Sequence, residues 1–191
     1  GNQVTDLSPL KNLAKLEDLD LMYNKVSDLT ALKELEQLKK LGLWGNQVKD
    51  IGPLKDLPQL ENLTLSFNPI EDLSPLRELQ QLQELGLIKT QVKDLSPLKN
   101  LKQLKSLSLP GNQIKDLSPL KELNQLETLK GSSSGLTDMS VLKGLTQLKG
   151  LSLPRNRISD LTFLKDLTKL NSIELSFNLI EDVSHMKELK Q

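Results

Sequence analysis

The 191-residue sequence contains no cysteine and a single histidine. Without thiols the chain can form no disulfide, no thiolate metal cluster and no cysteine nucleophile. The one histidine, His185, stands near the end of the chain with no second histidine to work with, and no glycine-rich phosphate-binding string occurs. The sequence therefore predicts a protein that is not an enzyme and has no metal site and no cofactor.

The sequence also lacks an excess of either charge and lacks long apolar runs. Its 25 basic residues balance 25 acidic residues, so nothing in the net charge favours a nucleic acid or an anionic membrane as partner. No stretch approaches the roughly 18 apolar residues that a membrane helix needs, and no signal peptide is visible. We expect no nucleic-acid binding and no membrane insertion.

What the sequence does contain is a 22-residue period. One column, which we call the ladder column, is asparagine at seven of its nine positions. The column comprises Asn2, Asn24, Asn46, Asn68, Thr90, Asn112, Ser134, Asn156 and Asn178. Aspartate follows four residues after every member. A fixed period of this length predicts a solenoid of stacked coils, so we interpret residues 1–191 as a single repeat domain of about eight to nine coils.

A leucine pair with one residue between, such as Leu41 and Leu43, precedes most of the ladder positions. Alternation with period two predicts a short strand with its leucines inward, and stacking one strand per coil gives an eight-stranded parallel sheet about 40 Å long. The ladder amides should bond the backbone of neighbouring coils. Because the aspartates recur on a fixed lattice, we interpret them as caps and turn supports.

The return side of each coil reads like Ser118-Pro119-Leu120 with a further leucine at Leu123. A hydroxyl before a proline is a helix-start signal, and leucines three apart suit one or two turns of α or 3₁₀ helix. This side is longer than the strand side, so the stack should curve with the sheet on its concave face. The fold class predicted is α/β, a curved leucine-rich repeat solenoid with short helices on its convex face.

The pattern LxxLxxLxLxxNxIxDLSPLxxL resembles the 22-residue repeats of bacterial internalins and internalin-like surface proteins, and less closely those of phosphatase-regulatory leucine-rich repeat proteins. The resemblance covers essentially the whole chain, and the Ser-Pro-Leu after the aspartate favours the internalin side. It implies a module that binds a protein on its concave face, on a bacterial surface or secreted, with a cytoplasmic location as the alternative.

Function should lie in outward-facing columns, because the core columns are occupied. We name the column two before the ladder the face column, and the column one before it the rim column. Four of the five aromatic residues lie in these two columns. Exposed aromatics are typical of binding hot spots, so the sequence predicts one contiguous patch of Met22, Tyr23, Trp44, Phe67 and Ile88 from successive coils, although these side chains could instead cover the edge of the core.

Phe177 is a weaker candidate of the same kind. It shares the string SFN with Phe67, which also suits an ordinary structural variant. Charges on this side change sign along the stack, and uneven charge can select a partner's orientation. The candidate polar contacts are Lys89, Lys130, Arg155 and Arg157. A solvated face with no role explains these charges equally well.

One coil departs from the pattern twice. Gly131 replaces an inward leucine and Ser134 replaces the ladder asparagine. Loss of a buried leucine side chain typically costs a few kcal/mol, so we expect this coil to be the least stable part of the stack. It could serve as a hinge or as a dent that accepts a partner's side chain, or the two changes could be neutral drift. Thr90 should still make one ladder bond.

Two other interpretations remain open at this stage. The chain could be a structural spacer or an engineered repeat scaffold without its own ligand, or the substrate-selecting part of a larger enzyme. Neither end carries the polar capping unit usual for solenoids, so we expect a fragment lacking both caps. Open sheet edges also predict end-to-end self-association.

Overall fold

The computed structural model describes residues 1–133 and 135–188. Within them the chain forms one open sheet of eight parallel strands in sequence order, β1 to β8. The strands are Asp18–Asp20, Lys40–Gly42, Asn62–Thr64, Glu84–Gly86, Ser106–Ser108, Thr128–Lys130, Gly150–Ser152 and Ser172–Glu174. Neighbouring strands pair in the same register throughout, with Leu41 opposite Leu63 and Leu63 opposite Leu85. The predicted leucine-rich repeat solenoid is confirmed.

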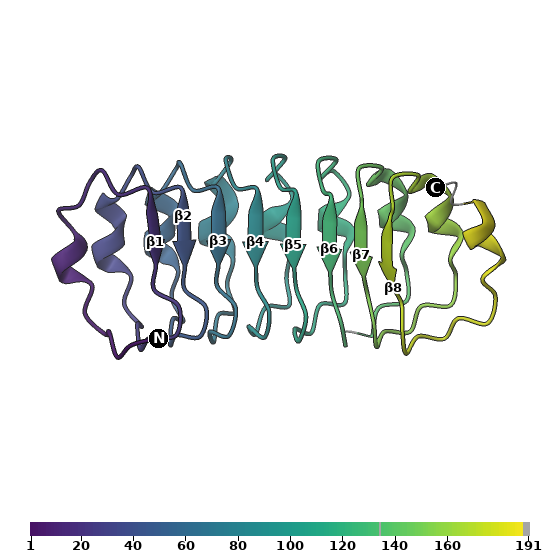
Figure 1. Ribbon diagram of the computed structural model, residues 1–191, viewed down its shortest axis with the longest axis horizontal. Coiled ribbons are helices and arrows are strands. Elements are labelled where there is room, and N and C mark those ends of the chain that lie inside the picture. Colours follow the sequence, from purple (N-terminus) through teal and green to yellow (C-terminus); the bar gives the residue numbers. More distant parts are fainter. Residues whose placement is uncertain (134, 189–191) are drawn as a thin grey trace.

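The return side consists of short 3₁₀ turns, η1 to η9. They are Ser8–Leu10, Thr30–Glu34, Gly52–Asp56, Ser74–Glu78, Ser96–Leu98, Ser118–Leu120, Ser140–Gly144, Thr162–Asp166 and Ser184–Glu188. The sequence left α and 3₁₀ helix open, and all helical turns of the described residues are 3₁₀. In Figure 1 these turns lie behind the sheet and fan out more widely than the strands, which places the sheet on the concave side.

The leucine columns fill the space between sheet and turns. In the coil of β2, Leu32, Leu35, Leu38 and Leu43 are fully buried, and Leu41 is 2% exposed. Equivalent residues are buried in the neighbouring coils. Each coil therefore contributes one layer to a continuous core, and removal of this apolar surface from water is the main stabilising term.

The asparagine ladder connects the coils as predicted. The Asn68 amide nitrogen donates to Leu43 O and Leu65 O, at 2.8 and 3.0 Å, and the backbone N–H of Val48 donates to its Oδ1 at 2.9 Å. Thr90 makes a reduced version, since its hydroxyl lies 3.1 Å from Leu87 O and 2.8 Å from Asn112 Oδ1. Ser134, the other exception, lies outside the described residues.

The aspartate column caps the 3₁₀ turns, which corrects the predicted role of the serines. In every coil one aspartate Oδ1 accepts the backbone N–H two residues later, for example Ser74 N–H to Asp72 at 2.8 Å and Gly52 N–H to Asp50 at 2.7 Å. The Ser74 hydroxyl donates back to Asp72 Oδ2 at 2.7 Å and makes no bond to its own helical turn. Since each turn begins at the serine itself, the free N–H at its start is the serine's own, and the aspartate two residues earlier accepts it.

Candidate functional site: the concave face and its rim

Residues at alternate positions of each strand face away from the core and line the concave side of the sheet. In the coil of β2 these are Lys40, Gly42 and Trp44, while Leu41 and Leu43 between them are buried. Trp44 is half-buried. The face column predicted from the sequence is therefore outward-facing, as the alternation requires.

The rim column has a backbone feature that sequence reasoning missed. The eight residues of this column that follow Gly1 all have positive φ, between 48° and 80°. Two are glycines, and the other six are Tyr23, Phe67, Lys89, Ser133, Arg155 and Phe177. The left-handed region is uncommon for residues with a Cβ and costs roughly 1–2 kcal/mol each. Gly45 and Gly111 in this column were the signal that could have revealed it.

This turn directs the larger rim side chains along the stack. A Cβ on Gly45 would lie 3.1 Å from Tyr23 Cδ1, and a Cβ on Gly111 would lie 2.7 Å from Lys89 Cγ. The side chains of Tyr23 and Lys89 therefore lie over the glycine of the next coil. Such close approach is possible because those glycines have no side chain.

The structure brings three of the predicted site residues together. The rings of Trp44 and Phe67 stack with their centroids 4.9 Å apart and their planes inclined by 28°. The Lys89 ammonium lies 5.1 Å from the centre of the Phe67 ring. Stacked aromatics and cations over ring faces attract each other, so Trp44, Phe67 and Lys89 form one ordered surface across three coils, which we call the aromatic platform.

The other predicted residues lie around the platform or apart from it. Met22 and Ile88 are half-buried in the face column on either side, and Tyr23 is 60% exposed at the rim. Lys130 is exposed at the end of β6. These positions are compatible with the predicted patch, and its role in binding stays a prediction.

A second cation pair lies towards β8. Arg155 lies 5.5 Å from the centre of the Phe177 ring, which is 76% exposed. Arg157 follows the ladder residue Asn156 and belongs to neither outward column. We therefore separate Arg155 and Phe177 from the aromatic platform, and Arg157 from both.

A recess opens on the concave face beside the platform. It has a volume of about 170 Å³ and its lining includes Asp18, Asp20, Met22, Lys40 and Thr64 around Gly42. The sequence placed a possible dent at Gly131 instead. Gly131 is buried, a Cβ on it would lie 3.5 Å from Leu153 Cδ2, and its N–H bonds Ser152 O at 2.8 Å.

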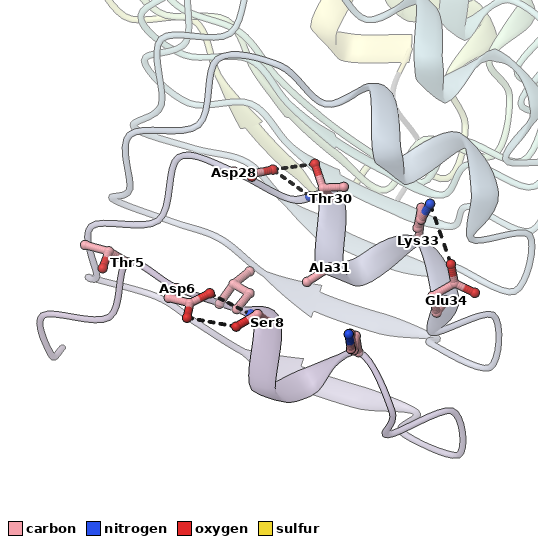
Figure 2. A pocket seen from close by; sticks show the side chains of 10 residues that line it. Thr5, Asp6, Ser8, Asp28, Thr30, Ala31, Lys33 and Glu34 are labelled. Carbon is pink, nitrogen blue, oxygen red and sulfur yellow. Dashed lines mark hydrogen bonds and ion pairs between the residues drawn. The ribbon is translucent and has the colours of Figure 1, made fainter.

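A larger hollow of about 610 Å³ lies on the convex side between η1 and η2. Figure 2 shows its polar groups bonded to one another: Asp6 to Ser8, Asp28 to Thr30, and Lys33 to Glu34. Ala31 occupies a position that is proline in most other coils, and its small side chain leaves the space. Asp6 and Asp28 already cap turns and Glu34 is paired with Lys33, so the polar groups of this hollow are occupied by one another.

An edge ladder of charges, also missed from the sequence, crosses the coils just before each strand. Glu17 bonds Lys39 at 2.8 Å and Glu127 bonds Lys149 at 2.7 Å, each pair 22 residues apart. Hydrogen bonding to Glu17 raises the pKa of Lys39, and hydrogen bonding from Lys149 lowers the pKa of Glu127. Such exposed ion pairs contribute little to stability. The charged side chains of these pairs already bind one another.

The described residues contain no cluster of three or more His, Cys, Asp or Glu side chains placed to hold a metal ion. They also contain no helix long and apolar enough to cross a membrane.

Comparisons with known proteins agree with this geometry. Residues 36–78 and 80–122 match the family described as Leucine Rich repeats (2 copies). Internalin C2 of Listeria monocytogenes superposes with a TM-score of 0.92 at 33% identity, covering 94% of this chain and 80% of that one. The chain belongs to the internalin-like leucine-rich repeat proteins.

Two further structures place this internalin-like chain among bacterial relatives. An internalin (inlF) of Listeria monocytogenes has a TM-score of 0.95 at 37% identity over 99% of this chain, which spans 56% of its length. A leucine-rich repeat protein of Leptospira interrogans has a TM-score of 0.92 at 31% identity, over 99% of this chain and 50% of that one. The comparison with curated proteins gives no match.

Proposed function

We propose that this internalin-like chain is a recognition module that binds a protein partner on its concave face through the aromatic platform. The observation that carries the proposal is the stacked pair Trp44–Phe67 with Lys89 against it. Apolar side chains left outside the core at adjoining coils are characteristic of interaction surfaces. Extended concave faces are also the surfaces that solenoid proteins commonly use for binding.

The surrounding residues have subsidiary roles in this proposal. Met22, Tyr23 and Ile88 extend the apolar contact area on either side of the platform. Lys89 and Lys130, with Arg155 and Arg157 further along, act as polar contacts that favour one orientation of the partner. The binding role is non-enzymatic. The internalin-like relatives support a bacterial surface or secreted location for the protein.

Replacement of Trp44 by alanine tests the proposal. Once a partner has been isolated with the wild-type chain, Trp44→Ala should weaken its binding by at least about 2 kcal/mol, as for a hot-spot aromatic. Calorimetric titration measures the loss, and circular dichroism checks that the fold is kept. Lys121→Ala on the convex side is the matched control and should leave affinity unchanged.

An unchanged affinity of Trp44→Ala would overturn the platform as the binding site. If no substitution on the concave face changes the affinity for any bound protein, the chain would instead be a spacer. That is the alternative left open by its repetitive sequence.

A further inference from the structure

The recess beside the aromatic platform exists because one outward column has a glycine at β2. Asp20, Gly42 and Thr64 lie side by side in register on β1, β2 and β3. A Cβ on Gly42 would lie 3.0 Å from Asp20 Oδ1 and 3.3 Å from Met22 Cγ. Asp20 and Met22 therefore lean over Gly42 and form one wall of the recess, and a side chain at Gly42 would force them aside. A recess of this size accepts one long side chain.

The carboxylates of the recess are available to a ligand. Asp18 and Asp20 are exposed, and Asp20 uses only Oδ1, which accepts the backbone N–H of Met22 at 2.8 Å. Lys40 lies opposite Asp18 on the neighbouring strand. Among the described residues no ion pair joins Lys40 to either aspartate.

The two ends of the platform differ in charge. Asp18 and Asp20 lie on β1, one strand before the coil of Trp44, whereas Lys89 contacts Phe67 from the far side. A basic side chain of a partner is attracted at the β1 end and repelled at the Lys89 end. The charges therefore orient whatever apolar group lies on the aromatic rings.

The spacing fits an extended segment. The recess is centred on Gly42, and Trp44 lies two residues further along the same extended stretch, which is about 6.6–7 Å. Side chains on one face of an extended chain are two residues apart, or about 6.6–7 Å. A basic residue in the recess and an apolar residue on the platform can thus come from positions i and i+2 of one segment.

Building on the proposed function, we propose that the partner presents an extended segment with a Lys or Arg two positions from an aromatic or large aliphatic residue. The basic side chain enters the recess at Gly42 towards Asp18 and Asp20. The apolar side chain packs on Trp44 and Phe67. The segment runs along the strand direction on the concave face, over the coil of β2.

Phage display of random 12-residue peptides on the immobilised full chain tests this inference. The wild type should enrich sequences with Lys or Arg two residues from Phe, Tyr, Trp, Leu, Ile or Met. Asp18→Asn combined with Asp20→Asn keeps an oxygen that can accept the Met22 N–H, and should remove the basic preference while keeping the apolar one. Glu174→Gln, in the column of Asp20 but at β8, is the matched control and should select as the wild type does.

A selected peptide without tryptophan then allows measurement in solution, because Trp44 is the only tryptophan of the chain. Its fluorescence should report the dissociation constant. The aspartate double variant should bind at least tenfold more weakly than wild type. Changing the peptide's basic residue to Gln should cost the same tenfold on wild type and nothing further on the variant.

The outcomes separate this inference from the proposed function. Enriched peptides that need Trp44 but show no basic preference would overturn the inference and leave the function standing, as would a double variant with wild-type affinity. Selection that is no different for Trp44→Ala would overturn both.

Discussion

The coils that carry Trp44 and Phe67 differ from the coil of Gly131 in where each departs from the repeat. In the former the departures are outward, and the inward leucines Leu43 and Leu65 remain fully buried. In the latter the departure is inward, at Gly131, and the neighbouring outward residues are the small Ser132 and Ser133. A substitution at an outward-facing position changes the side chains of the surface and leaves the core packing intact. A substitution at an inward-facing position removes contacts from the core.

The ladder follows the same distinction. Asn46 and Asn68 each bond the backbone of the preceding coil and of their own coil. These bonds hold the strands in register beneath the aromatic platform, so the rings are presented by coils whose scaffold is complete. The comparison implies that binding and stability can be changed separately in this molecule.

The largest effect should come from the ladder beneath the platform. Asn68 is 2% exposed, and its side chain satisfies three backbone carbonyls and the N–H of Val48. Asn68→Ala leaves these groups unsatisfied in a buried site, which should cost about 3 kcal/mol. Thr90→Ala removes a hydroxyl that can donate only one hydrogen bond and should cost about 1 kcal/mol.

Urea unfolding of the two variants measures this difference, with the slope of the transition monitored to confirm that the same surface is exposed. An equal loss of unfolding free energy for Asn68→Ala and Thr90→Ala would contradict this prediction. It would show that threonine stabilises a ladder position as much as asparagine does.

A second pair of changes contrasts an inward glycine with a rim glycine. Gly131 is buried without positive φ, and a Cβ there meets Leu153 at an ordinary 3.5 Å. Gly131→Ala should therefore raise stability by about 0.5–1 kcal/mol. Gly111 has φ of 80° and a Cβ there would lie 2.7 Å from Lys89 Cγ, so Gly111→Ala should lower stability by about 1–2 kcal/mol.

Thermal unfolding of both alanine variants gives the sign directly. A loss of stability for Gly131→Ala would mean that the coil of Gly131 has already closed around the missing side chain.

The sequence predicted the columns in which burial restricts the residue type. It missed the columns in which many residue types can adopt the same backbone geometry. Inward leucines and ladder asparagines each satisfy one physical demand at every coil, so their period is visible. The left-handed rim is hidden because six of its residues are not glycine, with Phe67 among them. The recess escaped notice because Gly42 stands in an outward column, where a missing side chain looks neutral until its neighbours are placed.

The serine cap failed for a different reason. A hydroxyl before a proline is a sound helix-start signal by itself, but Ser74 is already the first residue of its turn. Its hydroxyl donates to Asp72 Oδ2, while Asp72 Oδ1 accepts its backbone N–H. End-to-end self-association stays a prediction, to be checked by sedimentation at increasing concentration.

The smallest expected effect concerns pH and comes from the capping aspartates whose pKa is lowered, namely Asp6, Asp28, Asp72, Asp94 and Asp138. The hydroxyl and then the backbone N–H of Ser74 lower the pKa of Asp72 from its ordinary value of 3.8, and the same groups of Ser96 lower the pKa of Asp94. A carboxylate with a depressed folded pKa stabilises the fold above its unfolded pKa, and this stabilisation is lost as pH falls through the folded value. The urea midpoint should therefore decrease below pH 3.8 as these five aspartates protonate. Asp72→Asn keeps an acceptor for the Ser74 N–H but not for its hydroxyl, so it should lower the midpoint slightly at pH 7 and converge with wild type in acid. Because hydrogen bonds are larger causes of the shift than the Arg77 charge, most of the difference should persist in 0.5 M salt, roughly five times the concentration at which the Debye length is about 10 Å. A difference that salt abolishes would instead assign it to the basic residues of the convex side.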